Sequence, residues 1–353
     1  MDIKEIPGKF AIDSEPQPYG DGHINETYLL ESQRYILQRI NTSIFTDPAA
    51  LMENVARVTA FLREKIRRAG GDPLRETLTV IPTKDGKSYY AAPDGSAYRM
   101  YLFVPNTVSV SQVTDPHDLL QVGRGFGRFQ RMLGDYPADT LHEVIPDFHH
   151  TPKRIEALRA AIAADAVGRV ASVRQELDFA LGLAGESDRI VRGIEDGSIP
   201  LRVTHNDTKI NNILFDAATR EAICVIDLDT VMPGSVLYDI GDALRTGAAD
   251  AAEDEADLSL VHFNMDAFTY FVRGFLDEMR GEMTARETEL IPYSAMLMTY
   301  ECGVRFLTDY LCGDTYFRIH RPDHNLIRAR NQFAMVRDIL QKTPEMREIV
   351  ARI

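Results

Sequence analysis

The sequence predicts an α+β fold with two lobes: a small β-rich N-lobe over residues 1–104 and a larger, mainly helical C-lobe over residues 105–353. Two observations lead to this expectation. A chain of 353 residues with 44% hydrophobic composition exceeds the usual size of one domain, which favours two packed units with room for a cleft between them. The hydrophobic pattern also changes from mostly strand-like to mostly helix-like after Pro105.

Short β-like runs dominate the first hundred residues. They are TYLL, the alternating YILQRIN, LTVIPT, a KDGKSYY hairpin and AYRMYLFV. One helix interrupts them over residues 48–69, where apolar side chains recur at helical spacing and two glycines follow. We therefore expect a small sheet with a single helix.

The helical pattern of the remaining chain has one break, between Leu201 and Asp229. In this break two short β-like runs, NILFD and AICVIDLD, flank the turn sequence AATRE. Most of the residues that could carry chemistry lie there.

Composition excludes several classes of protein. A net charge of -14 argues against a nucleic-acid or anionic-membrane partner, because either would need a basic face to neutralise phosphates. The N-terminal residues lack the apolar core of a signal peptide, and no later run is long enough to cross a bilayer, so a cytoplasmic protein is expected. The three cysteines have no CxxC spacing, which makes a disulfide framework or a zinc site improbable.

The segment HNDTKINN (205–212), followed after the hairpin by Asp227, has the residue order of a phosphoryl-transfer site. Such a site needs a carboxylate to accept the proton of the attacking hydroxyl, an amide and a second carboxylate to hold Mg²⁺, and a cation to neutralise the phosphoryl group. Asp207 suits the base, Lys209 the cation, and Asn212 and Asp227 the metal ligands. Singly each residue is typical of a turn, but the ordered set predicts an ATP- and Mg²⁺-dependent kinase.

Histidines near this motif are expected to have structural roles. His205 precedes the loop and should pack and bond the backbone, because the role of base is already filled. The pair His149-His150 has adjacent side chains that diverge and no third ligand at suitable spacing. We expect a loop or substrate-side position for that pair, not a metal site.

The HNDTKINN motif resembles the catalytic loop of the aminoglycoside phosphotransferase and choline kinase family, relatives of the protein kinases. The resemblance covers nearly the whole chain and implies a protein-kinase-like arrangement of the two lobes. The segment YDIGD (238–242) is similar to a part of the family in which an Asp braces the catalytic loop through backbone hydrogen bonds. That role is structural.

The same resemblance assigns a nucleotide site to the N-lobe. The segment GDGHINET (20–27) looks like the family's nucleotide loop, with Asn25 where a third glycine would complete G-x-G-x-x-G. Alternation in YILQRIN puts Tyr35, Leu37 and Arg39 on one face, so Arg39 could pair with the nucleotide phosphates and with Glu53 on the following helix. The alternative is that Arg39 and Glu53 are separate exposed residues.

Residues 102–104 lie where the hinge of the family presents backbone groups to adenine. Together these segments give the expected nucleotide-binding residues, which are Gly20, Gly22, His23, Asn25, Thr27, Arg39, Glu53, Leu102 and Val104.

Longer segments are similar to the bacterial N-acetylhexosamine 1-kinases, which phosphorylate the anomeric hydroxyl of N-acetylglucosamine or N-acetylgalactosamine. They include VIDLDTVMPGSVLYDIGDALR and ECGVRFLTDYLCGDTYFRIHRPDHNLIRARNQ. The run ECGVRFLTDYL is typical of an amphipathic helix in which Arg305 interrupts the apolar pattern, and Tyr316 offers an aromatic face and a hydroxyl. The resemblance implies that Asp207, Arg305 and Tyr316 line a sugar site. An internal salt bridge for Arg305 and a core position for Tyr316 are the alternatives.

Two other functions fit the sequence. The protein could phosphorylate another alcohol, such as choline, homoserine, an aminoglycoside or a hexose, and a cationic acceptor would favour acidic and aromatic walls. It could also be a catalytically inactive nucleotide-binding module. The complete set of Asp207, Asn212 and Asp227 argues against an inactive module, which has no physical need for all three.

Overall fold

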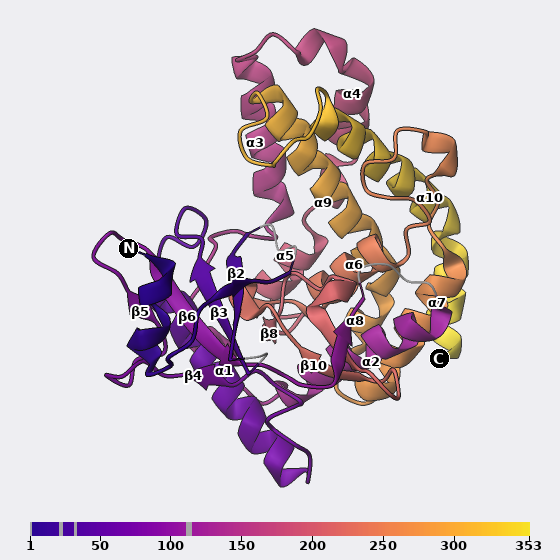
Figure 1. The fold of residues 1–353 in the computed structure, drawn as a ribbon. Helices are drawn as coiled ribbons and strands as arrows, with labels where there is room; N and C mark the ends of the chain where they lie inside the picture. Colours follow the sequence, from indigo (N-terminus) through magenta and orange to yellow (C-terminus); the bar gives the residue numbers. More distant parts are fainter. Residues whose placement is uncertain (1, 21–23, 32–33, 111–114) are drawn as a thin grey trace.

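The computed structural model describes residues 2–20, 24–31, 34–110 and 115–353 (Figure 1). An antiparallel sheet with one long helix forms the N-terminal part, and helices dominate the rest. In Figure 1 the indigo and violet sheet lies beside the helical part, with the segments around β8 and β10 between them. The predicted two-lobed α+β architecture is confirmed.

The N-terminal sheet has the strand order β1-β2-β3-β6-β4, and β5 also pairs with β6. All its pairs are antiparallel. Its strands are β1 (Gln17–Pro18), β2 (Glu26–Leu30), β3 (Tyr35–Ile40), β4 (Val80–Ile81), β5 (Tyr90–Ala91) and β6 (Ala97–Leu102). The expected LTVIPT strand is thus only two residues long.

The two faces of this sheet are covered differently. On one face, Tyr35 and Leu37 of β3 pack with Met100 of β6 in a small core against the N-terminal segment. The other face, which carries Ile40 and Tyr101, belongs to the large core that continues into the helical part. Directly opposite residues of an antiparallel pair share a face, so the register of β3 and β6 decides which polar side chains point toward the helical part.

Helix α1 (Pro48–Arg68) is the helix expected over residues 48–69. Asp47 caps it by accepting the N–H groups of Ala49 and Ala50 at 3.1 and 3.0 Å. Its buried residues face the large core, and the amide of Asn54 donates to the carbonyl of Val231 at 2.9 Å. α1 therefore joins the sheet to the segment that follows Asp227.

The helical part is built on two long helix–helix contacts, α2 with α7 and α9 with α10, and α9 also packs against α3 and α6. Among the described residues, no helix is long and apolar enough to cross a bilayer. The helices are α2 (Pro116–Met132), α3 (Thr151–Ala164), α4 (Arg174–Gly182), α5 (Arg189–Glu195), α6 (Val236–Gly247), α7 (Met265–Glu278), α8 (Ala285–Glu289), α9 (Ile291–Leu311) and α10 (His324–Arg352).

The expected break in the helical pattern contains the predicted hairpin, β9 (Ile213–Asp216) with β10 (Ala222–Val225). The strand β7 (Thr107–Ser109) extends this hairpin, and β8 (Arg202–Thr204) pairs with β11 (Met232–Gly234). β7, β8 and β11 have three residues each, too few to show a sequence period. They were not predicted, yet β8 and β11 lie on either side of the catalytic motif in the sequence.

Candidate active site

The HNDTKINN motif occupies the loop from β8 to β9. His205 is fully buried, and its Nε2 lies 2.9 Å from the carbonyl of Ile226, while Phe126 and Phe129 contact its ring edge-on. The N–H of Asp207 donates to its Nδ1 at 3.3 Å. A neutral ring with the proton on Nε2 satisfies both partners, so His205 is part of the scaffold as predicted.

Asp239 at the start of α6 fixes the backbone of the loop. Its two carboxylate oxygens accept the N–H of His205 at 3.0 Å and the N–H of Asn206 at 2.7 Å. Asn206 has a φ of +65°, an uncommon backbone conformation that these bonds hold. Burial raises the pKa of Asp239, and the donors from the loop oppose that rise. The predicted Asp brace is confirmed.

Asp242, one turn further along α6, provides a second brace. It accepts the N–H of Thr208 at 3.0 Å and is paired with Arg245 at 3.0 Å. Arg245 is buried and also binds Glu253 at 2.7 Å, so two carboxylates share this one guanidinium. The backbone on both sides of Asp207 is therefore anchored to one helix.

Asp207 itself keeps 21% of its side chain exposed, and its Oδ1 lies 2.8 Å from the Nζ of Lys209. Burial alone would raise the pKa of Asp207, but the neighbouring ammonium outweighs that effect and holds the pKa below its ordinary value. Burial would lower the pKa of Lys209, but Asp207 and Asp242 raise it. The loop thus presents an ionised carboxylate beside a charged ammonium.

Asn212 and Asp227 are brought together by the hairpin. The side-chain amide of Asn212 donates to the carbonyl of Asp207 at 2.8 Å, and its backbone carbonyl accepts the N–H of Ile226 at 2.9 Å. Because the amide nitrogen is used in the loop, the side-chain oxygen of Asn212 is the group suited to a cation. Asp227 follows directly after Ile226 in a left-handed conformation with a φ of +60°.

The charge around Asp227 favours a bound cation. Burial, followed by the nearby carboxylates of Asp229 and Asp207, raises the pKa of Asp227 to about 7. A divalent ion would relieve this crowding, and Mg²⁺ prefers the oxygen ligands present here. In the described part of the chain, no group of three or more His, Cys, Asp or Glu residues could form a metal cage, so such an ion would depend on phosphate and water oxygens as well.

A buried cation that the sequence did not reveal faces this cluster. Arg99 of β6 is 1% exposed, pairs with Asp229, and donates from its Nε to the side-chain oxygen of Gln38 at 2.9 Å. Asp229 also accepts the amide of Asn25 at 2.6 Å. Arg99 and Asn25 thus connect the N-terminal sheet to the segment that carries Asp227. The only feature of the sequence that could have indicated this buried cation is an arginine between apolar residues in AYRMYL.

The predicted ion pair between Arg39 and Glu53 is wrong. Arg39 does share a face with Tyr35 and Leu37, but that face is turned away from the large core. Its guanidinium binds Glu26 on the neighbouring strand at 3.0 Å, whereas Glu53 lies 3.0 Å from His142. Alternation in the sequence defines two faces of a strand but does not say which face is buried. The register of β3 and β6 places Gln38 and Arg99 on the inner face of the sheet, the one that faces the large core.

The other residues expected at the nucleotide lie near this inner face. Asn25 is 9% exposed, and its side-chain oxygen accepts the N–H of Asn41 at 3.0 Å. Thr27 of β2 accepts the amide of Gln38 at 3.1 Å. Gly20 has a φ of +76° with open space where a side chain would be, while Gly22 and His23 are outside the described residues.

The expected hinge follows β6. The N–H of Leu102 donates to the carbonyl of Thr79 at 2.9 Å, and the carbonyl of Val104 accepts the hydroxyl of Thr107 at 2.8 Å. Arg75 reaches the carbonyl of Pro105 at 3.3 Å. These bonds hold the connection between sheet and helices in place.

Arg305 and Tyr316, two residues expected at the acceptor, lie close to one another. The Arg305 guanidinium lies over three aromatic rings, at 5.5 Å from the centre of Phe148, 5.9 Å from Tyr316 and 5.4 Å from Phe317. Among the residues that the structure describes, no carboxylate lies in ion-pair range of this guanidinium. Tyr316 is 61% exposed. The internal salt bridge and the core ring are therefore both excluded.

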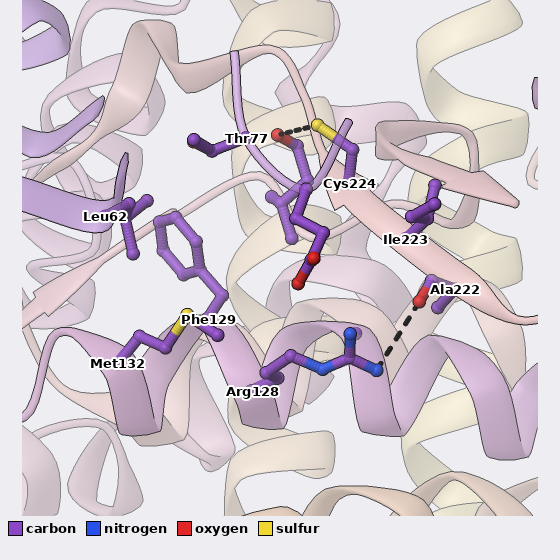
Figure 2. Close-up of a pocket in the computed structure, with 11 residues that line it drawn as sticks. Leu62, Thr77, Arg128, Phe129, Met132, Ala222, Ile223 and Cys224 are labelled. Atoms are coloured by element: carbon purple, nitrogen blue, oxygen red, sulfur yellow. Dashed lines mark hydrogen bonds between the residues drawn. The ribbon is translucent and has the colours of Figure 1, made fainter. Parts of the chain in front are cut away.

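A separate small cavity lies behind the hairpin, between α1, α2 and β10 (Figure 2). Its volume of about 30 Å³ is enough for water but not for a nucleotide or a sugar. Figure 2 shows Cys224 on its wall and the bond from Arg128 to the carbonyl of Ala222. Burial raises the pKa of the Cys224 thiol to about 12, so it is not a nucleophile.

Solved structures with the same fold are phosphotransferases of small molecules. A microcompartment-associated aminopropanol kinase matches with a TM-score of 0.62 and 16% identity, covering 96% of each chain. An aminoglycoside phosphotransferase from Alicyclobacillus acidocaldarius matches with a TM-score of 0.63 and 16% identity, over 100% of this chain and 97% of that one. A choline kinase from Cryptosporidium parvum gives 0.56 and 14%, over 95% and 90%. The similarity in structure over nearly the whole chain establishes the protein-kinase-like fold.

The family model described as "Phosphotransferase enzyme family" matches residues 15–271. The matched region includes the N-terminal sheet, the catalytic loop with both of its braces, and the metal-binding candidates. It covers well over half of the chain. The protein therefore belongs to the phosphotransferase enzyme family.

Proposed function

We propose that the protein transfers the γ-phosphoryl group of ATP to a hydroxyl of a small neutral sugar, an N-acetylhexosamine, at its anomeric oxygen O1. Residues 1–104 would act as the N-lobe and residues 105–353 as the C-lobe, with the nucleotide between them. Family membership and the ordered catalytic set support the kinase chemistry. The surroundings of Arg305 support the acceptor.

In this proposal Asp207 accepts the proton of the sugar hydroxyl. Its ionised state and partial exposure suit that role. Lys209 balances the charge on the phosphoryl group, and Asn212 and Asp227 would hold Mg²⁺ against the nucleotide phosphates. When bound, Mg²⁺ would neutralise negative charge on the phosphates.

On the nucleotide side, the proposal keeps Gly20, Asn25 and Thr27 in the phosphate loop and the backbone of Leu102 and Val104 at the base. Arg99 replaces Arg39 as the cation closest to the metal-binding segment, since Asp229 and Asp227 both interact with it electrostatically. Glu53 and Arg39 are then peripheral. Arg99 acts through Asp229, because it is too buried to meet a phosphate directly.

The single observation that carries the acceptor assignment is the guanidinium of Arg305 surrounded by aromatic rings. A guanidinium donates to ring hydroxyls and to an N-acetyl oxygen, and an exposed tyrosine can stack on the apolar patch of a sugar. A cationic acceptor such as choline or an aminoglycoside would be repelled. Arg154 is a second guanidinium near Arg305, since after burial the charge of Arg305 is the next cause that lowers the pKa of Arg154.

The choice of O1 follows from acidity. The anomeric hydroxyl is more acidic than the other ring hydroxyls, so a carboxylate base has less proton-transfer work to do there. Arg305 and Tyr316 could hold the ring by its other hydroxyls while O1 faces Asp207, an orientation that a small displacement would degrade.

The test is an acceptor panel with ATP and Mg²⁺, in which ADP release and the loss of reducing ends are measured together. N-acetylglucosamine and N-acetylgalactosamine should both stimulate ADP release, with one reducing end lost per ADP. Choline and an aminoglycoside should not stimulate it. Stimulation by choline alone would contradict the sugar assignment, and ADP release without any acceptor dependence would contradict the kinase assignment.

A further inference from the structure

A buried histidine outside the proposed chemistry contacts the peptide that carries Asp207. His149 is 8% exposed, and its Nε2 lies 3.0 Å from the carbonyl oxygen of Asn206. Its Nδ1 lies 2.9 Å from Oε1 of Glu301 on α9, which is 1% exposed. The ring therefore connects the catalytic loop to the helix that carries Arg305.

Both partners of His149 are acceptors. A backbone carbonyl can only accept, so Nε2 must carry a proton. Burial would raise the pKa of Glu301, but the bond from His149 and its charge hold that pKa below its ordinary value, and Thr151 donates to the other oxygen at 2.6 Å. An ionised Glu301 accepts as well, so Nδ1 must carry a second proton. With Glu301 ionised, the imidazolium form satisfies both hydrogen bonds of the ring together.

The peptide between Asn206 and Asp207 is consequently held at both of its polar atoms. His149 donates to its carbonyl, and His205 accepts its N–H at 3.3 Å. Rotation of this peptide would move the Asp207 side chain and break both bonds. Glu301 and Arg305 are four residues apart on α9, so they lie on the same face of one helix.

We propose that His149, as an imidazolium ion-paired with Glu301, is a positioning residue that sets the orientation of Asp207 relative to the acceptor site on α9. This inference rests on the proposed function, because it takes Asp207 as the base and places the acceptor near Arg305 on α9. His149 does not touch the reacting atoms; it acts through the Asn206 carbonyl.

The ionisable groups that face this pair come from three elements. Glu301 and Arg305 are on α9, Arg154 is on α3, and Tyr238 of α6 has its ring 5.1 Å from that of His149. Burial, then Glu301, raises the pKa of Tyr238, so this phenol is neutral and adds no charge. Glu301 is thus the counter-ion of the imidazolium.

The first test needs no activity. In ¹⁵N-detected NMR of the full-length wild-type protein at pH 7.5, assigned through side-chain to backbone correlations, both ring nitrogens of His149 should have the shifts of protonated nitrogens. A pyridine-type shift at either nitrogen would overturn the imidazolium assignment. This result is independent of which acceptor the enzyme uses, so it separates this inference from the proposed function.

The second test is kinetic, with MgATP and N-acetylglucosamine. His149→Gln should lower kcat about ten- to a hundredfold while KM for MgATP changes less than about twofold, because misplacement of the base affects the chemical step and not nucleotide binding. His262→Gln is the matched control, since His262 also bonds a backbone carbonyl, that of Ser259 at 3.0 Å, but in an exposed loop. It should leave kcat unchanged. A folded His149→Gln variant with unchanged kcat would overturn the positioning role.

A double-mutant cycle tests whether the two residues act as one unit. Glu301→Gln should cause a loss similar to that of His149→Gln, and the double variant should lose no more than the worse single variant. If the losses in kcat multiply in the double variant, the two substitutions act independently, and the proposal that His149 and Glu301 act as one unit is contradicted. Inactivity of the wild-type protein toward every acceptor would instead reject the proposed function, and the NMR result would still decide the inference.

Discussion

Arg99 of β6 and Asp229, which lies two residues after Asp227, form an ion pair between two almost fully buried side chains, 1% and 5% exposed. The pair joins the N-terminal sheet to the segment that carries Asp227, and Asn25 adds a bond to the same carboxylate. A charge pair removed from water is costly unless both members stay matched. Its position beside the catalytic carboxylates indicates that it fixes the relation between the two parts of the site.

Removing one partner of this pair should be strongly destabilising. Arg99→Leu leaves Asp229 buried without its cation, so we expect a loss of about 3–5 kcal/mol in the free energy of unfolding, measured by urea denaturation. Arg39→Leu is the control, because Arg39 and Glu26 are 45% and 56% exposed, and a surface pair contributes about 0–1 kcal/mol. Equal losses in the two variants would contradict the different burial assigned to the two arginines.

Close packing of α6 on α9 should also be sensitive to substitution. A side chain at Gly241 would collide with the backbone carbonyl of Ser294, so Gly241→Ala should destabilise the protein by about 1–3 kcal/mol. It should also lower kcat, because α6 carries both braces of the catalytic loop. Gly182→Ala provides the comparison: Gly182 is exposed at the end of α4 with open space around it, and alanine there should be neutral or stabilising. A Gly241→Ala variant as stable as Gly182→Ala would show that the helices can separate.

Asp207→Asn should abolish most of the turnover without weakening nucleotide binding. Loss of a positioned general base costs about 10²–10⁴ in rate, and the carboxylate acts on the acceptor proton. The measurement is kcat beside the Kd of an ATP analogue by calorimetry. A parallel fall in nucleotide affinity would place Asp207 at the nucleotide instead.

Asp227→Asn should behave differently, with weaker MgATP binding as well as slower turnover. The substitution would remove a charged ligand at a position where burial, followed by the carboxylates of Asp229 and Asp207, raises the pKa of Asp227 to about 7. A Mg²⁺ titration of activity should show a higher Mg²⁺ requirement in this variant. An unchanged Mg²⁺ dependence would remove Asp227 from the metal site.

The sequence allowed prediction of those parts of the site that are local in the chain. The HNDTKINN loop, the hairpin to Asp227 and the brace at Asp239 lie within about forty residues, and each residue type has a chemical reason for its place. Helix α1 was also predictable, because an apolar stripe, a cap and a glycine stop coincide.

The other parts of the site could not be predicted, because they depend on which distant segments of the chain come into contact. Whether Arg39 or Arg99 faces the large core is decided by the strand register and by what covers each face of the sheet. The contact of His149 with Glu301 joins residues 152 positions apart, and no periodicity in the sequence encodes it. Tertiary packing, not local pattern, makes these side chains functional candidates.

Transfer to O1 is tested directly by ³¹P–¹H correlation NMR of the product formed from ATP, Mg²⁺ and N-acetylglucosamine. We expect a new phosphate monoester whose phosphorus couples to the anomeric proton. This ester should be absent from the reaction with the Asp207→Asn variant. Phosphorus coupled to the C6 protons would contradict transfer to O1, and no new ester with any sugar of the panel would contradict the assignment of a sugar kinase.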